Sequence, residues 1–235
     1  MMFTSFKKKI QEFNAGREYR KIIPEIHRVT QGMNAGELVD FVLSDEWKRF
    51  FWMIQIPSEI KWLVGQVEAL RPKVIVEIGT RMGGTLFLFT KVADTSATIV
   101  SIDYPDGHGG GYPKSREGFY KSFAVSPQNL HLIKGDSHNS LTLQMLKNII
   151  NDRPIDFLFV DGDHSYNGVK MDYEMYGSLV RPGGIIAFHD NKPTNSNNWS
   201  GVIPFWKEIK KKTKASEFFG SEDEWGGMGI VEVTR

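Results

Sequence analysis

The sequence contains no cysteine among its 235 residues. A chain without thiols forms no disulfides, thiolate zinc sites or iron–sulfur clusters, and it has no cysteine nucleophile. An excess of positive charge is also missing, because 29 Lys and Arg residues stand against 28 Asp and Glu residues. Phosphate contacts supply much of the affinity of nucleic-acid binders, which are usually basic. We therefore expect no nucleic-acid partner.

Long apolar runs are absent as well. No uncharged apolar stretch approaches the roughly 18 residues that a membrane-spanning helix needs. No apolar segment of signal-peptide length follows the lysines at positions 7–9. We therefore expect a cytoplasmic protein without membrane contacts. Apolar residues make up 40% of the sequence, which is typical of a globular protein with a substantial core.

The first 70 residues have a helical pattern. The beginning of this region contains Gly16 and Pro24, residues that often mark the ends of helices. From Leu38 onward, apolar residues recur at helical spacing. Another helix is predicted after Pro57, with Ser58 as its N-cap residue. We interpret residues 1–70 as a helical N-terminal extension, and it is a candidate surface for homo-oligomer formation.

Residues 71–235 are predicted to form one α/β domain. Short apolar runs alternate with helical patterns, which is typical of a parallel sheet covered by helices on both faces. The last two strands have only a short connection and predict an antiparallel hairpin. The predicted strands are 74–78, 98–103, 130–133, 155–161, 184–189, 216–219 and 229–233, and the predicted helices between them lie near 84–93, 114–124, 138–151, 166–179 and 203–213.

The carboxyl ends of the first two strands predict a ligand site, because ligands of open α/β sheets bind there. The first strand runs into Gly79 and Gly83 and then directly into a helix, whose N-terminus offers free N–H groups. Asp103 ends the second strand, where a carboxylate can accept hydrogen bonds from a ribose. A nicotinamide dehydrogenase has the same two features.

Two residues favour S-adenosylmethionine over a dinucleotide. Arg81 occupies the position at which the dinucleotide fingerprint requires glycine for the approach of the pyrophosphate. Glu77, two residues before the first glycine, suits a cationic ligand. S-adenosylmethionine is such a ligand, with an ammonium group, a sulfonium and a ribose.

Residues 57–235 resemble the class I S-adenosylmethionine-dependent methyltransferases. Residues 77–83 resemble their first motif, residues 101–103 their second, and residues 135–137 their adenine-contacting segment. Arg81 departs from the glycine that many members have. The resemblance implies a Rossmann-like, doubly wound, seven-stranded sheet. It also implies cofactor contacts from Glu77, Gly79, Thr80, Gly83, Asp103, Tyr104, Asp136, Ser137 and Asp161.

A metal site is predicted where the fourth and fifth strands end. Asp161 and Asp190 should converge there, and two carboxylates, the amide oxygen of Asn191 and water suit Mg²⁺. His164 is the candidate general base, since an imidazole accepts a proton near neutral pH. His189 either ligates the metal or orients the site.

The same residues resemble metal-dependent O-methyltransferases, and more closely the macrocin-type and mycinamicin-type sugar O-methyltransferases and the cephalosporin hydroxylase-like proteins. Asp161 and His164 match the Asp-x-x-His segment of that group, whereas His189 stands where an acid is usual. Asn191 competes with His189 as the third ligand. The resemblance implies methyl transfer to a hydroxyl of a small molecule, of the sugar or natural-product type.

Two alternative functions remain open on the sequence. One is a cofactor-dependent oxidoreductase, because some relatives are hydroxylase-like. The other is a non-catalytic cofactor-binding or scaffold domain. The glycine-rich segment 105–112 is a candidate lid, and residues 193–201, with Trp199, are a candidate wall of the acceptor pocket.

Overall fold

The computed structural model describes residues 2–105, 111–112, 114–193, 199–220 and 225–234, and for residues 2–15 it describes the backbone only. Seven strands form one sheet in the order β3-β2-β1-β4-β5-β7-β6. The strands are β1 (Val74–Ile78), β2 (Thr98–Asp103), β3 (Asn129–Lys134), β4 (Ile155–Val160), β5 (Val180–His189), β6 (Lys214–Phe218) and β7 (Met228–Glu232).

Strands β1 to β5 are parallel, and β7 is antiparallel to both β5 and β6. The Rossmann-like, doubly wound sheet with a C-terminal antiparallel hairpin is therefore confirmed. β5 begins four residues earlier than predicted, because its pairing with β4 shifts register between Ile155 and Phe157. This irregular start lies far from the ligand-binding edge.

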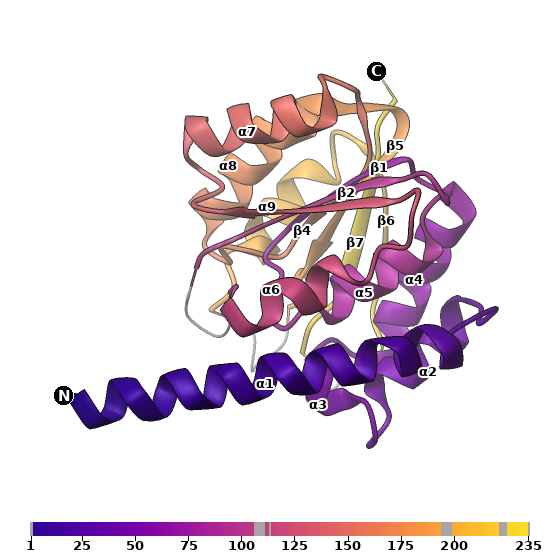
Figure 1. Ribbon diagram of the computed structural model, residues 1–235. Coiled ribbons are helices and arrows are strands. Elements are labelled where there is room, and N and C mark those ends of the chain that lie inside the picture. The colour runs from indigo at the N-terminus through magenta and orange to yellow at the C-terminus, as the bar shows by residue number, and fades with distance from the viewer. Residues whose placement is uncertain (1, 106–110, 113, 194–198, 221–224, 235) are drawn as a thin grey trace.

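Helices cover both faces of the sheet (Figure 1). One face carries α4 (Pro57–Leu70), α5 (Gly84–Val92) and α6 (Lys114–Lys121), and the other carries α7 (Ser140–Ile150), α8 (Tyr166–Tyr176) and α9 (Val202–Ile209). Alternate residues of each strand enter the two cores, since successive side chains point to opposite faces. In β4, for example, Phe157 belongs to one core and Leu158 to the other.

The remaining helices, α1 (Met2–Val29), α2 (Ala35–Leu43) and α3 (Lys48–Phe51), extend the core on the α4–α6 side. α1 runs past α6, and its N-terminal end projects beyond the rest of the molecule (Figure 1). It continues without a break through Gly16 and Pro24, although both residues usually disfavour a helix. Tertiary packing outweighs the low helix propensity of these residues; the Tyr19 ring, for instance, stacks on Phe119 with a centroid distance of 4.7 Å.

The start of α4 also differs from the prediction. The N-cap residue is Ile56, and Pro57 is the first helical residue, so assigning Ser58 as the cap was wrong. Proline is favoured at the first helical position because its fixed φ suits the helix and no N–H is needed there. Within the described part of the chain, every helix is too short or too polar to cross a membrane.

The strand register aligns the ligand-binding edge of the sheet. Ile78 is paired with Ile102 and with Val160, and Val160 is paired with Phe188. The residues that follow these four strand ends therefore lie along one edge.

The docking of α1 depends on a neutral histidine. His27 Nε2 donates to the carbonyl oxygen of Ser122 at 2.8 Å, and Lys91 Nζ lies 3.0 Å from His27 Nδ1. Partial burial and the charge of Lys91 lower the pKa of His27. Protonation would place two cations in contact.

Acidification should consequently weaken the fold through His27. With a lowered folded-state pKa, the stabilisation is present above the unfolded value of about 6.5 and is lost as the pH falls below it. Between pH 7.5 and 5.5, the unfolding free energy of the wild type should fall by about 0.5 kcal/mol more than that of His27→Gln, after allowance for solvent screening. Urea titrations of both proteins measure this difference, and parallel pH profiles would contradict it.

Candidate active site

A cavity of about 490 Å³ lies at the carboxyl ends of the parallel strands. The loops after β1, β2, β3, β4 and β5 line it, together with the segment between α3 and α4. The lining residues fall in the ranges 52–55, 78–82, 84–85, 102–104, 111, 135–138, 161–164 and 189–190. The sheet edge predicted from the sequence is therefore the edge that is hollowed.

The turn after β1 has a left-handed backbone at three positions. The φ angles are 88° at Gly79, 48° at Arg81 and 80° at Gly83. A Cβ atom on Gly83 would lie 2.5 Å from Tyr120 Cε1, so packing as well as conformation requires glycine there. Gly79 lines the cavity, but Gly83 does not. Arg81 adopts a conformation that costs a non-glycine residue about 1–2 kcal/mol, at the position where many methyltransferases have glycine.

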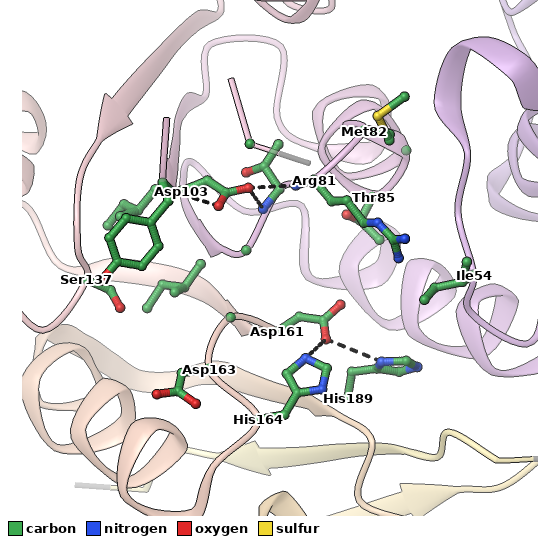
Figure 2. Close-up of a pocket in the computed structure, with 18 of the residues that line it drawn as sticks. Ile54, Arg81, Met82, Thr85, Asp103, Ser137, Asp161, Asp163, His164 and His189 are labelled. Carbon is green, nitrogen blue, oxygen red and sulfur yellow. Dashed lines mark hydrogen bonds and ion pairs between the residues drawn. The ribbon is translucent and has the colours of Figure 1, made fainter. Parts of the chain in front are cut away.

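Asp103 anchors this turn to β2 (Figure 2). Its Oδ2 accepts hydrogen bonds from the backbone N–H groups of Thr80 (3.0 Å) and Arg81 (2.7 Å), and its Oδ1 accepts one from Tyr104 N–H (2.7 Å). Burial raises the pKa of Asp103, and the three N–H donors act against this shift. Asp103 thus shapes the turn and also faces the cavity, where we predicted a ribose contact.

Glu77 lies beneath the turn rather than on the cavity wall. Its side chain is fully buried, and its two oxygens accept hydrogen bonds from the hydroxyls of Thr80 (2.9 Å) and Thr85 (2.6 Å). Burial raises the pKa of Glu77 to about 8. Both threonines line the cavity, so Glu77 acts on the site through them; its direct contact with a cofactor stays a prediction.

The predicted adenine segment lies on the cavity wall after β3. Asp136 and Ser137 line the cavity together with Tyr104, whose side chain is 52% exposed. The segment is held by hydrogen bonds from His138 N–H to Asp136 Oδ1 (2.9 Å) and from the Tyr176 hydroxyl to the Ser137 carbonyl oxygen (2.6 Å).

The carboxyl ends of β4 and β5 bring two carboxylates and two imidazoles together, and Figure 2 shows Asp161, His164 and His189 of this group. His164 lies between the acids, with Nδ1 2.8 Å from Asp190 Oδ2 and Nε2 3.3 Å from Asp161 Oδ1. His189 Nδ1 is also 3.3 Å from Asp161 Oδ1. The ligand atoms of Asp161, His164 and Asp190 lie within 4.8 Å of one another, which is compatible with a shared metal ion.

Charge pairing dominates the titration of this cluster. Burial lowers the pKa of His164, but hydrogen bonds and charges from Asp161 and Asp190 outweigh it and raise the pKa to about 10. Burial opposes ionisation of Asp161, but the charges of His189 and His164 hold its pKa well below the usual range. His189 likewise has a raised pKa, because the charge of Asp161 outweighs burial.

Asn191 lies apart from this cluster. It does not line the cavity, and its side chain packs against β7: a Cβ on Gly229 would lie 2.4 Å from Asn191 Nδ2. His164 and His189 lie close to the paired carboxylates, and Asn191 as a metal ligand stays a prediction.

Several site residues were missed by the sequence analysis. Residues 52–55 wall the cavity, and Gln55 Nε2 donates to Asp161 Oδ2 at 3.0 Å. This segment has no periodic pattern in the sequence, and its only signal there is the tryptophan at position 52, shortly before Pro57. His138, discussed below, was missed as well.

The two predicted loops are described only in part. Trp199 is 65% exposed and stacks on His164, with ring centroids 5.7 Å apart and an interplanar angle of 8°. This contact agrees with the predicted acceptor wall. Residues 106–110 of the candidate lid and residues 194–198 lie outside the described residues.

Comparisons with known proteins agree with this geometry. Residues 76–191 match the model of a methyltransferase domain family. The predicted resemblance to class I S-adenosylmethionine-dependent methyltransferases is confirmed. The matched region contains the turn after β1 and also the Asp161–Asp190 cluster.

Two curated relatives match part of the chain. The uncharacterized protein y4gI of Sinorhizobium fredii is 30% identical over 153 residues, which cover 63% of this chain and 16% of the relative. The uncharacterized protein R132 of Acanthamoeba polyphaga mimivirus is 34% identical over 144 residues, which cover 61% of this chain and 62% of the relative. The matched region thus spans less than two thirds of either relative.

Solved structures share the fold. An O-methyltransferase from Bacillus cereus, solved with SAH, is 18% identical, with a TM-score of 0.56 and coverage of 90% of this chain and 97% of that one. The TDP-rhamnose 3'-O-methyltransferase CalS11 of calicheamicin biosynthesis is 17% identical, with a TM-score of 0.57 and coverage of 94% of both chains.

The buried Glu77 carboxyl should make the protein less stable at alkaline pH. Since its folded-state pKa is raised to about 8, its stabilisation is complete below the unfolded value of about 4.5 and is lost as the pH rises toward 8. From pH 5 to pH 8 the stability of wild type relative to Glu77→Gln should fall by about 3 kcal/mol. Chemical denaturation across this range tests it, and a pH-independent difference would refute the burial argument.

Proposed function

We propose that this protein transfers a methyl group from S-adenosylmethionine to a hydroxyl of a small molecule of the sugar or natural-product type, with the assistance of Mg²⁺. The observation that carries the proposal is the position of Asp161, His164 and Asp190 in the same cavity as the turn after β1. The SAH complex of the Bacillus cereus relative and the TDP-rhamnose enzyme CalS11 support the donor and the acceptor class.

The wall residues suggest an orientation for the cofactor. Tyr104, Asp136 and Ser137 would contact the adenine end, and Asp103 would accept hydrogen bonds from the ribose. The methionine end would then lie over Gly79 and Thr80 and bring the sulfonium methyl toward Asp161. Holding donor and acceptor in line lowers the barrier by removing the entropy cost of their encounter.

The donor set at the ends of β4 and β5 fits a divalent cation. Asp161 and Asp190 supply carboxylate oxygens, which Mg²⁺ prefers, and an imidazole ligand is better suited to a transition metal. Asp190 Oδ1 is buried and takes no hydrogen bond from the described residues, so it is available to a cation. When bound, the metal would lower the pKa of an acceptor hydroxyl and compensate the charge of the two carboxylates.

We assign His164 as the general base. Its ring faces the cavity between the two acids, and Trp199 stacks on it. In the present arrangement both ring nitrogens face carboxylates, which favours the protonated form. A cation bound to those carboxylates would weaken their hold on the imidazole proton and leave one ring nitrogen to accept the hydroxyl proton. His189 would orient Asp161.

Three further expectations from the sequence remain predictions: a cytoplasmic location, a small-molecule rather than nucleic-acid or membrane partner, and self-association through the N-terminal helices. The projecting end of α1 supports the last of these (Figure 1). Sedimentation velocity of the full chain tests it, and a monomer at all concentrations would exclude it.

Loss of the base should abolish turnover without loss of cofactor binding. We expect His164→Ala to reduce methyl transfer by about 100-fold or more, and to leave the Kd for SAH within about twofold. SAH release from a panel of sugars and phenols measures turnover, and calorimetry measures binding. Unchanged turnover would remove His164 as the base. A wild type that binds NAD(H) rather than SAH would instead favour the oxidoreductase alternative.

Metal binding has a readout that is independent of activity. We expect Mn²⁺, used as a paramagnetic probe for Mg²⁺, to bind wild type and Asp163→Asn, and to bind Asp190→Asn about 10-fold or more weakly. Asp163 is a suitable control because it is an exposed acid in the same loop as Asp161 but outside the cluster. Titrations followed by electron paramagnetic resonance measure free Mn²⁺. Equal affinity of all three proteins would contradict a metal site at Asp190.

A further inference from the structure

A second buried carboxylate, outside the Asp161 cluster, lies behind the cavity wall. Asp172 in α8 has no exposed surface, and its oxygens take no well-formed hydrogen bond from the described residues. A buried carboxylate without such partners is costly, so it is retained only where something compensates it. The proposed transfer reaction uses no group at this position.

Asp172 lies directly behind two residues of the cavity wall. Its Oδ1 is 3.2 Å from Nε2 of His138, and a Cβ atom on Gly162 would lie 3.7 Å from its Oδ2. His138 and Gly162 both line the cavity, after β3 and after β4 respectively. The Asp172 carboxylate thus packs behind the loop after β3 and the loop after β4, on the side opposite the cavity.

The imidazole of His138 has a defined orientation. Nε2 lies 3.2 Å from both Asp172 Oδ1 and the carbonyl oxygen of Gly168, and both are acceptors, so Nε2 carries the proton that faces them. Nδ1 is turned toward Asp136, 3.7 Å from its Oδ1. The ring is therefore held from the α8 side and remains only partly exposed, at 18% of its side chain.

We propose that His138 is a further contact for the adenine end of the cofactor, and that Asp172 is the positioning residue that orients it. This inference rests on the cofactor placement proposed above. His138 follows Asp136 and Ser137 in the same wall, and α8 holds this wall at two points: Asp172 at His138, and the Tyr176 hydroxyl at the Ser137 carbonyl oxygen. A carboxylate behind a histidine fixes its tautomer and its ring orientation.

The charge of Asp172 agrees with this arrangement. Burial raises the pKa of Asp172 to about 6, and the polar contact with Ser137 and the charge of His138 act against that shift. The acids Asp136 and Asp163 face it from the loops after β3 and β4 and raise its pKa further. Ser137 and His138, two consecutive residues of the cavity wall, therefore compensate a carboxylate in an otherwise acidic surrounding.

The proposal predicts a coupled loss of SAH affinity. Asp172→Asn keeps the shape of the side chain but removes its charge, and we expect the Kd for SAH to rise about 10-fold. His138→Ala should weaken binding by a similar factor. Because Asp172 acts through His138, the double variant should bind SAH no more weakly than the weaker single variant. Calorimetry with SAH on the full chain measures all of these values.

A matched control separates this effect from a general loss of stability. Glu174→Gln makes the same acid-to-amide change at an exposed position two residues further along α8, and its Kd should stay within twofold of wild type. Should Asp172→Asn fail to fold, His138→Ala still tests the contact, because His138 lies at the cavity surface. The proposal would be overturned if both single variants bound SAH with a Kd within twofold of wild type. It would also be overturned if the Kd of the double variant rose by the product of the two single increases. A wild type that does not bind SAH would instead overturn the proposed function.

Discussion

The site depends on a close approach of two backbones. A Cβ atom on Gly79 would lie 2.1 Å from the carbonyl oxygen of Asp161, so no side chain fits at position 79. The turn after β1 and the loop after β4 belong to adjacent parallel strands, and this contact fixes their separation. The proposed cofactor site and the proposed metal site are parts of one cavity for this reason.

Three buried or partly buried carboxylates hold different parts of the cavity lining in place. Asp103 binds the backbone N–H groups of the turn after β1, Glu77 binds the two threonine hydroxyls beneath it, and Asp161 joins two histidines and Gln55. Each acid has a different set of partners, and their pKa values are shifted in different directions as a result. The electrostatic character of the cavity is therefore set by local partners rather than by the net charge of the chain.

The sequence predicted the sheet well, because buried parallel strands read as continuous apolar runs and each strand end carries recognisable glycine, acid or histidine residues. It predicted the convergence of Asp161, His164 and Asp190 for the same reason. It did not predict the uninterrupted α1, which depends on packing against Phe119, or the burial of Glu77 beneath two threonines. Gln55 was missed because it enters the site through a tertiary contact that leaves no local pattern. His138 was missed although it directly follows the predicted segment 135–137, because its contact with Asp172 in α8 is tertiary. The domain boundary after residue 70 remains a prediction.

One wall of the cavity comes from outside the family-matched residues. Segment 52–55 precedes β1, yet it lies over the ends of β1 and β4, with Met53 packed where a Cβ on Gly84 would come within 2.0 Å of its Cγ. The groups at the strand ends and this wall are thus encoded in separate stretches of the gene. Mutation in the short stretch can reshape the wall while the strand ends stay unchanged, so homologues with identical strand ends need not share the shape of the cavity.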